Sequence, residues 1–466
     1  MALTTGSSAL ARRDGLLAAA AVVAALMAGY GLVAVAARLG GDNGPLVLLA
    51  LVGVPLAALA VLNDPRLAPA LVVLAFPVGV MELPGIELQL VQLATLAVAA
   101  LVALRRMASG LAPLSWVRGM GWGVAFVAWM LVGLPTALNR QRALREIVLF
   151  AIGMVFAATV VAVARRPGDV RALLAVVVGV VAAVGLTTPL GASQVRAAFD
   201  GAVVQGRATG IFTQPNQLGT FCATGALIGI GVFFAAQTRR GRLFAGIGVA
   251  GGVLGLVLSL SRGSWIGFVL GAVVLVVKLP EARRALMLAV VPVVLLGAAL
   301  SAFAPTSPQV EVVGQRLRSI AGERNPYDNR PAIWREAQGE IVEQPVTGYG
   351  AGSFPQASAR ATSKARTVVA EHAHNLLLTW GAELGLPALG LALGLAVHLH
   401  VAMRRMARRV AAEDRAVVAG LAAALVGVLG QGIVDYTLHN AVVLTLLFAM
   451  VGAVFAYDRI TRTAPA

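Results

Sequence analysis

Charged side chains are scarce in this sequence. Asp, Glu, Lys and Arg supply only 12% of its 466 residues, whereas hydrophobic residues supply 59%, and the mean hydropathy is +0.85. A soluble globular protein of this composition would expose far too much apolar side chain to water. The scarcity of charge therefore excludes a soluble globular protein and predicts a polytopic membrane protein.

Cysteine and paired acids are also nearly missing. The single cysteine, Cys222, excludes an internal disulfide and a cysteine-based metal site, and its apolar surroundings predict a buried thiol. The connections expected on the outer face contain no DxD or ExD pair, because Asp42 stands alone and Glu82 and Glu87 are five residues apart. We therefore expect neither a metal ion nor another cofactor.

Basic residues outnumber acidic ones by 37 to 21, which gives a formal net charge of +16. A surplus of this size can indicate nucleic-acid binding, but here the bases lie in short clusters between apolar runs. Membrane proteins fix their orientation by this pattern. We interpret the charge as topology and expect no nucleic-acid partner.

Fourteen apolar runs bounded by charged residues, Pro or Gly are candidate membrane spans. They are 15–37, 45–62, 67–80, 86–104, 121–138, 144–164, 171–190, 216–236, 243–260, 264–279, 284–303, 374–402, 416–434 and 439–457. The first run has 23 residues, enough to span a membrane, so we interpret it as a span and not as a secretory signal. The second and third are short and contain Pro55 and Pro77, so the sequence predicts an all-α bundle of 12 to 14 transmembrane helices.

The basic clusters fall on one side when the connections are assigned alternately to two faces. That side receives 22 of the 37 bases, including Arg66, Arg105, Arg106, Arg165 and Arg459. The positive-inside rule makes it the cytoplasmic side, with both termini there. The division expected is transmembrane helices over 1–303, an outer loop over 304–373 and C-terminal transmembrane helices over 374–466.

The long outer segment, 304–373, is less apolar than the rest of the chain. Ile333, Ala337 and Ile341 recur there at helical spacing, which predicts a large helical cap on the outer face. No internal repeat of the kind seen in duplicated transporters is visible. A transporter or lipid flippase and a structural scaffold remain alternatives to an enzyme.

The stretch EHAHNLLLTW, 371–380, places two of the five histidines against an apolar run. His374 is expected in the first turn of a span, where the helix dipole and partial desolvation disfavour the imidazolium form, and a neutral imidazole can accept a proton. The alternative is a histidine that caps the helix end. His372 is a partner or a bystander, and Glu371 could orient either ring.

Two arginines suit an anion on the same outer face. Arg262 interrupts the apolar stretch LVLSLSRGSWIGFVL, although an arginine within a membrane costs about 2.5–3.5 kcal/mol on insertion scales. Arg207 precedes Pro215, which is placed to open a helix with Gln214 or Asn216 near its cap, and a helix N-terminus beside an arginine suits phosphate. The alternatives are a turn arginine bound to lipid or carbonyl groups and a loop arginine paired with acids.

A glycine-rich stretch, GYGAGSF, follows at 348–354. Gly348 and Gly350, on either side of Tyr349, let backbone amides approach an anion or let the chain turn tightly. The remaining histidines do not form a three-ligand metal site by their spacing. These are His398, His400 and His439.

Five motifs, taken in order, resemble the bacterial O-antigen ligase and polymerase superfamily, including its protein O-oligosaccharyltransferase branch. They are RATGIFTQPNQLG, SLSRGSWIG, RPAIWREAQGEIVEQPVTGYGAGSF, EHAHNLLLTWGAELGLPALG and QGIVDYTLHN, and they extend over 207–440, about half of the chain. The resemblance implies a helical bundle of the GT-C type in a bacterial inner membrane. The QPNQLG element slightly favours the protein-glycosylating branch.

The resemblance also implies a reaction. A glycan would pass from an undecaprenyl diphosphate carrier to an acceptor hydroxyl on the periplasmic face, without a metal, with His374 as the base and Arg207 and Arg262 on the diphosphate. Attack from the face opposite the diphosphate predicts inversion of configuration. The acceptor, which could be lipid A-core, a growing glycan or a protein, stays open, as do the sugar and the oligomeric state.

Overall fold

The computed structural model describes residues 44–79, 82–83, 86–191, 196–199, 202–205, 207–283, 329–360 and 370–463. The predicted spans 15–37 and 284–303 lie outside these residues, as do 304–328 and 361–369 of the expected cap. Within the described residues the chain is helical except for connections and two short hairpins. The prediction of an all-α polytopic membrane protein is therefore confirmed.

Eight of the described helices are long and apolar enough to cross a membrane. They are α4 (Leu90–Ala108), α6 (Arg140–Val163), α7 (Pro167–Gly191), α8 (Pro215–Ala235), α9 (Arg239–Ser259), α15 (Leu376–Arg409), α16 (Ala412–Gly432) and α17 (Ala441–Thr463). The total of 12 to 14 spans stays a prediction, because part of the chain lies outside the described residues.

Further helices, most of them shorter, occupy the remaining predicted spans of the described part. They are α2 (Gly44–Asn63), η1 (Pro65–Leu67), α3 (Ala68–Leu74), η2 (Phe76–Val78), α5 (Met120–Val132) and α10 (Arg262–Lys278). The predicted span 67–80 is thus divided into short pieces. Prolines stand at the start of these pieces, where their missing N–H group costs no helical hydrogen bond.

Glycines allow the helices of the second half to pack closely. A Cβ atom on Gly185 of α7 would come within 1.9 Å of the carbonyl oxygen of Gly251 in α9, and one on Gly267 of α10 within 2.4 Å of the carbonyl oxygen of Gly427 in α16. Small residues at such contacts bring backbones together where lipid offers no hydrophobic driving force. α8 packs against both α9 and α16, and this arrangement brings the starts of α8 and α10 close to the end of α16.

Helices α13 (Arg330–Glu343) and α14 (Phe354–Arg360) form the described part of the predicted cap. Ile333 and Ala337 are buried in a small apolar cluster separate from the main core, and Ile341 and Leu378 pack against it. The predicted helix is therefore confirmed. The domain boundaries at 303 and 373 stay a prediction.

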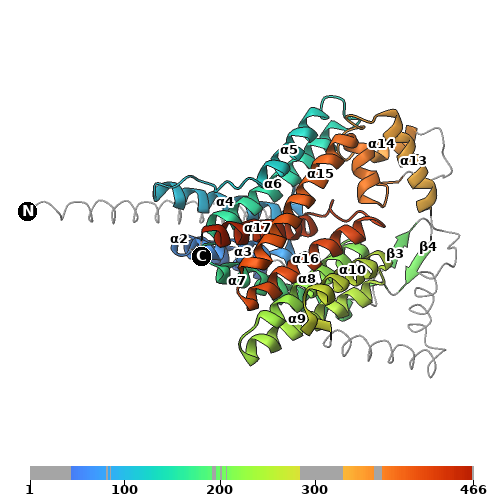
Figure 1. The fold of residues 1–466 in the computed structure, drawn as a ribbon. Coiled ribbons are helices and arrows are strands. Elements are labelled where there is room, and N and C mark those ends of the chain that lie inside the picture. Colours follow the sequence, from blue (N-terminus) through green and yellow to red (C-terminus); the bar gives the residue numbers. More distant parts are fainter. Residues whose placement is uncertain are drawn as a thin grey trace, which may run out of the picture.

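Two hairpins are present that the sequence analysis did not predict. Strand β1 (Glu82–Leu83) pairs with β2 (Ile86–Gln89), and β3 (Arg196–Phe199) pairs with β4 (Ala202–Gln205), both antiparallel. Figure 1 shows β3, β4, α13 and α14 at one end of the bundle and the C-terminus at the opposite end. Strands this short lie below the length at which alternation of side chains gives a signal.

The basic connections gather at the end opposite the cap. Four of the arginines assigned to one face line a single cavity: Arg66, Arg105, Arg106 and Arg165. The Arg459 guanidinium donates a hydrogen bond to the carbonyl oxygen of Ala164, beside that cavity. These five arginines therefore lie together, as the charge pattern predicts for them, and the identity of this end as cytoplasmic stays a prediction.

Candidate active site

His374 lies just outside α15. The helix begins at Leu376, and its N-cap is Asn375, whose Oδ1 accepts hydrogen bonds from the N–H groups of Leu377 and Leu378 at 2.9 and 3.0 Å. His374 precedes this cap with φ at 49°, a left-handed conformation that is uncommon outside glycine. The prediction that His374 occupies the first helical turn is therefore wrong, and the capping role belongs to its neighbour.

The imidazole of His374 contacts a carboxylate from another part of the chain. Its Nδ1 atom lies 2.9 Å from Oδ1 of Asp435, in the connection between α16 and α17. The His374 side chain is 23% exposed, and that of Asp435 is 5% exposed. An Nδ1–H group donating to the carboxylate leaves Nε2 as the proton acceptor.

Asp435 is held by further donors. Its Oδ1 also accepts the N–H of Tyr436 at 2.9 Å, and its Oδ2 accepts the side-chain amide of Asn216. Burial opposes ionisation of Asp435, but the hydrogen bond from His374 lowers the pKa of the carboxyl group well below its usual value. The carboxylate is therefore ionised where it faces the imidazole.

Arg207 joins this group through Asn216. Its Nη2 donates to Oδ1 of Asn216 at 2.7 Å, and its Nε donates to the carbonyl oxygen of Ser259 at the end of α9, at 3.0 Å. Arg207 is only 5% exposed. A continuous series of contacts thus runs from His374 through Asp435 and Asn216 to Arg207.

The start of α8 presents Asn216 to this group. Pro215 is the first residue of the helix and Gln214 is its N-cap, as predicted, although the Gln214 side chain makes no capping hydrogen bond. Asn216 does not cap the helix, because its amide is used between Arg207 and Asp435.

Arg262 is the first residue of α10, close to the same group. Its neighbour Ser261 caps the helix by accepting the N–H of Ser264, and the Ser264 hydroxyl contacts the carbonyl oxygen of Asn216 at 3.4 Å. A Cβ atom on Gly263 would lie 2.8 Å from the side chain of Val434, which precedes Asp435 in the chain. The backbone at Arg262 therefore lies between the start of α8 and the connection that carries Asp435.

Two further histidines surround His374. The ring of His372 lies 4.4 Å from that of His374 and 5.1 Å from that of His439, measured between centroids. Burial and the neighbouring imidazoles lower the pKa of His372 well below its usual value, and its Nδ1 accepts the N–H of His374 at 3.3 Å. Glu371 is exposed. The carboxylate that hydrogen-bonds to the His374 ring is therefore that of Asp435, not that of Glu371.

Comparison with known families gives one match. Residues 247–393 match a family model described as O-antigen ligase. This segment is similar to O-antigen ligase domains. The match confirms the resemblance to the O-antigen ligase-like superfamily, and it includes Arg262, His372 and His374, whereas Arg207 and Asp435 flank it. No curated protein matches the chain.

One group of ligand atoms, two of them from the matched segment, lies close enough together to hold a metal ion. His372, His374 and Asp435 each bring one such atom within 4.8 Å of the others, and no other group of this kind occurs among the described residues. Two imidazoles and a carboxylate suit a transition metal. The Nδ1 atom of His372 already accepts a backbone N–H, and the Asp435 carboxylate already accepts three hydrogen bonds. The expected absence of a metal therefore needs a direct test.

Within the segment that matches the O-antigen ligase model, α15 is interrupted about two turns after its start. Gly385 has φ at 76°, and Pro387 has no N–H group to donate to the carbonyl oxygen of Glu383. The N–H of Leu386 donates to the carbonyl oxygen of Pro345, outside the helix, at 2.8 Å. Carbonyl groups in this turn of α15 therefore need donors from another segment.

The glycine-rich stretch supplies those donors. The N–H groups of Tyr349 and Gly350 donate to the carbonyl oxygens of Ala382 and Glu383 at 2.9 and 2.8 Å. Gly348 and Gly350 have φ at 60° and 91°, so the tight turn is present. These two amides are occupied and cannot bind an anion, so that interpretation of the stretch is wrong for them.

Asp435 was missed as a site residue, although it lies in QGIVDYTLHN, one of the motifs that carry the resemblance. The available signal was an acidic residue directly after an apolar run. A carboxylate at the end of a span is costly to desolvate and so needs a partner. Its partner, His374, is 61 positions away, and only packing of α15 against α16 brings the two together.

Proposed function

We propose that this membrane protein transfers a glycan from an undecaprenyl diphosphate carrier to an acceptor hydroxyl at the group around His374. The observation that carries the proposal is the series of contacts from His374 through Asp435 and Asn216 to Arg207. It connects a proton acceptor with a buried cation. Glycan transfer from a diphosphate carrier needs both groups in one place.

In the proposed reaction, the acceptor oxygen attacks the anomeric carbon while its proton passes to Nε2 of His374. The bond between the anomeric carbon and the diphosphate oxygen breaks, and its electron pair stays on the diphosphate. Asp435 stabilises the imidazolium that forms, as the carboxylate does in catalytic triads. Attack from the face opposite the leaving group inverts the configuration at the anomeric carbon.

The leaving diphosphate needs positive charge. Arg207, which is nearly excluded from water, and Arg262, at the start of α10, would supply it through charge-assisted hydrogen bonds. Such bonds are stronger in a desolvated site than in water. Two guanidinium groups can therefore perform the charge neutralisation that a divalent cation performs in other transferases.

The acceptor distinguishes three versions of this function. A lipid A-core acceptor makes the protein a ligase, a second lipid-linked glycan makes it a polymerase, and a Ser or Thr in a protein makes it an oligosaccharyltransferase. The periplasmic face of a bacterial inner membrane is the proposed place of reaction, because α13 and α14 of the cap lie at the end of the bundle opposite the C-terminus and the basic connections. Ala373, next to His374, packs in the apolar cluster of α13.

Turnover of a purified lipid-linked glycan by the full-length protein in detergent tests the proposal. Wild type should form product, and His374→Ala should lower kcat by about 10²–10⁴-fold, the usual contribution of a general base. His400→Ala is the matched control, because His400 is an exposed histidine farther along α15. A folded His374→Ala protein that works at the wild-type rate would remove the base from the mechanism.

A further inference from the structure

A cavity of about 540 Å³ lies at the end of the bundle opposite His374. Helix α6 connects the two ends: it begins beside the cap, where the N–H of Asn139 donates to the Ser353 hydroxyl, and it ends with Val163 at the cavity wall. The proposed transfer reaction uses no residue of this cavity.

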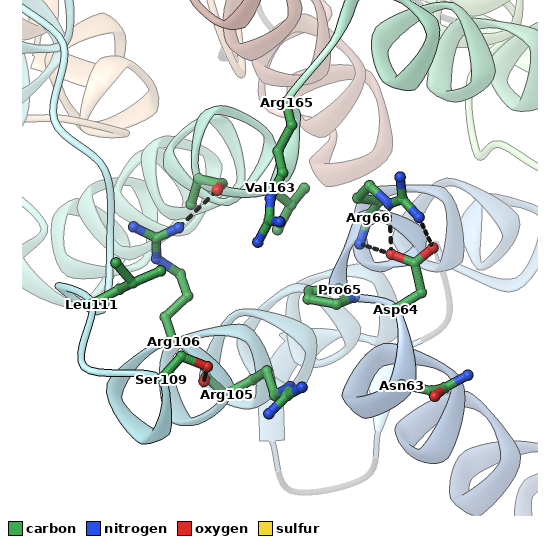
Figure 2. A pocket seen from close by; sticks show the side chains of 11 residues that line it. Asn63, Asp64, Pro65, Arg66, Arg105, Arg106, Ser109, Leu111, Val163 and Arg165 are labelled. Carbon is green, nitrogen blue, oxygen red and sulfur yellow. Dashed lines mark hydrogen bonds and ion pairs between the residues drawn. The ribbon is translucent and has the colours of Figure 1, made fainter.

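Guanidinium groups from three separate connections line the cavity: Arg66 after α2, Arg105 and Arg106 at the end of α4, and Arg165 between α6 and α7. Figure 2 shows these four groups arranged around one gap. Asp64 is the one carboxylate in the lining. The lining therefore carries a surplus of positive charge.

The acidic partners do not cancel this surplus. Asp64 holds Arg66 through two hydrogen bonds of 2.8 Å, and Asp169, outside the lining, lies 3.9 Å from Arg66. Arg106 donates to neutral acceptors instead, the carbonyl oxygens of Ala112 and Ala162, both at 2.8 Å. These contacts fix the position of the Arg106 guanidinium without neutralising its charge. A positioned, uncompensated guanidinium is suited to a phosphate oxygen.

Exposed apolar side chains flank the cavity residues along the chain, and we call them the apolar border. Leu104 and Met107 on α4 and Leu111 in the cavity wall are about half exposed, at 50%, 51% and 48%, and Trp116 is 64% exposed. Exposed leucine and methionine on a membrane helix face acyl chains, and tryptophan favours the interface between lipid and water. A ligand that uses both surfaces has a negatively charged head and apolar chains.

We propose that this cavity binds the phosphodiester head group of an anionic phospholipid, whose acyl chains lie against Leu104 and Met107. The cavity volume falls in the range of sites that bind small molecules. Basic pockets between membrane helices at the cytoplasmic face bind such head groups. Free phosphate shares the anionic chemistry but makes no use of the apolar border.

Native mass spectrometry of the full-length protein in detergent tests the proposal, with phosphatidylglycerol and phosphatidylcholine titrated separately. Phosphatidylglycerol should bind wild type more tightly than phosphatidylcholine does. An Arg105→Gln/Arg165→Gln variant should bind phosphatidylglycerol about tenfold more weakly, the loss expected when charge-assisted hydrogen bonds are removed. Arg239→Gln/Arg240→Gln, at the exposed start of α9, removes the same charge outside the cavity and should bind as wild type does.

Three results would overturn the proposal. The first is equal phosphatidylglycerol binding by wild type and the cavity variant. The second is a loss of phosphatidylglycerol affinity in the α9 control equal to that in the cavity variant. The third is displacement of the lipid by an excess of inorganic phosphate, which would assign the site to the free anion. If the glutamine variant loses its helical circular dichroism, Arg105→Lys/Arg165→Lys replaces it, and weaker binding is again expected because lysine lacks the planar fork. The readout is lipid binding, so its failure leaves the transferase proposal standing.

Discussion

The Nδ1 atom of His374 lies 2.9 Å from Oδ1 of Asp435, although 61 positions separate the two residues in the chain. The same carboxylate accepts the amide of Asn216, which in turn binds Arg207. A substitution at Asp435 should therefore affect both the imidazole and the arginine. Such a double effect would distinguish the proposed catalytic site from a histidine that lies at the membrane interface without a catalytic role.

Asp435→Asn should lower kcat by at least about tenfold with a small effect on the KM for the acceptor. The neutral amide stabilises the imidazolium less and can impose the other tautomer on His374. Steady-state kinetics in detergent measure the effect. Glu413→Gln, a half-exposed acid at the start of α16, is the control and should behave as wild type does. An equal loss in both variants would point to general destabilisation.

Arg207→Lys should raise the KM for the donor by about tenfold, because lysine keeps the charge but cannot maintain contacts with both Asn216 and the carbonyl oxygen of Ser259. Arg207→Ala should raise the KM for the donor further than Arg207→Lys does. The KM for the acceptor should change little. Arg335→Ala, on the exposed face of α13, removes an arginine from the same end of the molecule and serves as control. An unchanged donor KM in Arg207→Lys and Arg207→Ala would argue against the diphosphate contact.

His372 and His439 should lower the thermal stability as the pH drops from about 7 to about 5, relative to a variant that lacks both imidazoles. Burial lowers the pKa of both His372 and His439. Below about pH 6.5 the two imidazoles therefore bind protons in the unfolded state but not in the folded state, and this difference favours unfolding. Each group contributes a loss of up to about 1.4 kcal/mol per pH unit in that window. Asp435, whose pKa is lowered, stays ionised there and adds nothing. Melting curves of His372→Gln/His439→Gln should show a flatter pH dependence, and those of His400→Gln should not.

Gly348→Ala should destabilise the protein by more than about 1 kcal/mol, because a side chain at φ 60° is strained and its Cβ would lie 2.3 Å from the carbonyl carbon of Glu383. Gly339→Ala offers a matched comparison within α13, since nothing lies within 4 Å of its added Cβ. That change should stabilise the helix by up to about 1 kcal/mol. Similar melting temperatures for the two variants would contradict the close packing of the turn on α15.

Metal removal should leave glycan transfer unchanged, and added Zn²⁺ should inhibit it. The ligand atoms of His372, His374 and Asp435 lie close enough to hold an ion, which would occupy the imidazole needed as a base. His372→Gln should weaken zinc inhibition. Activity assays after EDTA treatment, with and without Zn²⁺, measure both effects. Loss of activity with EDTA and its recovery with Zn²⁺ would make the metal a cofactor and overturn the expectation.

Several local features could be predicted from the sequence. The start of α8 at Pro215, the helix over Ile333 and Ala337, and the grouping of the basic connections follow from propensity, periodicity and charge, which act over a few residues. The position of His374 was missed by two residues, because the helix starts after Asn375. Helix ends are decided by single capping side chains, and here two adjacent residues suited that role.

The sequence by itself determined that the chain is a membrane-embedded helical bundle with one basic end, because hydropathy and charge sum over neighbouring residues. Tertiary structure decided that Asp435 faces His374, and that the amides around Tyr349 bind carbonyl groups of α15 and not an anion. Both outcomes depend on which distant segments share a buried space. Every buried polar group must find a partner there, and no local pattern says which one it finds.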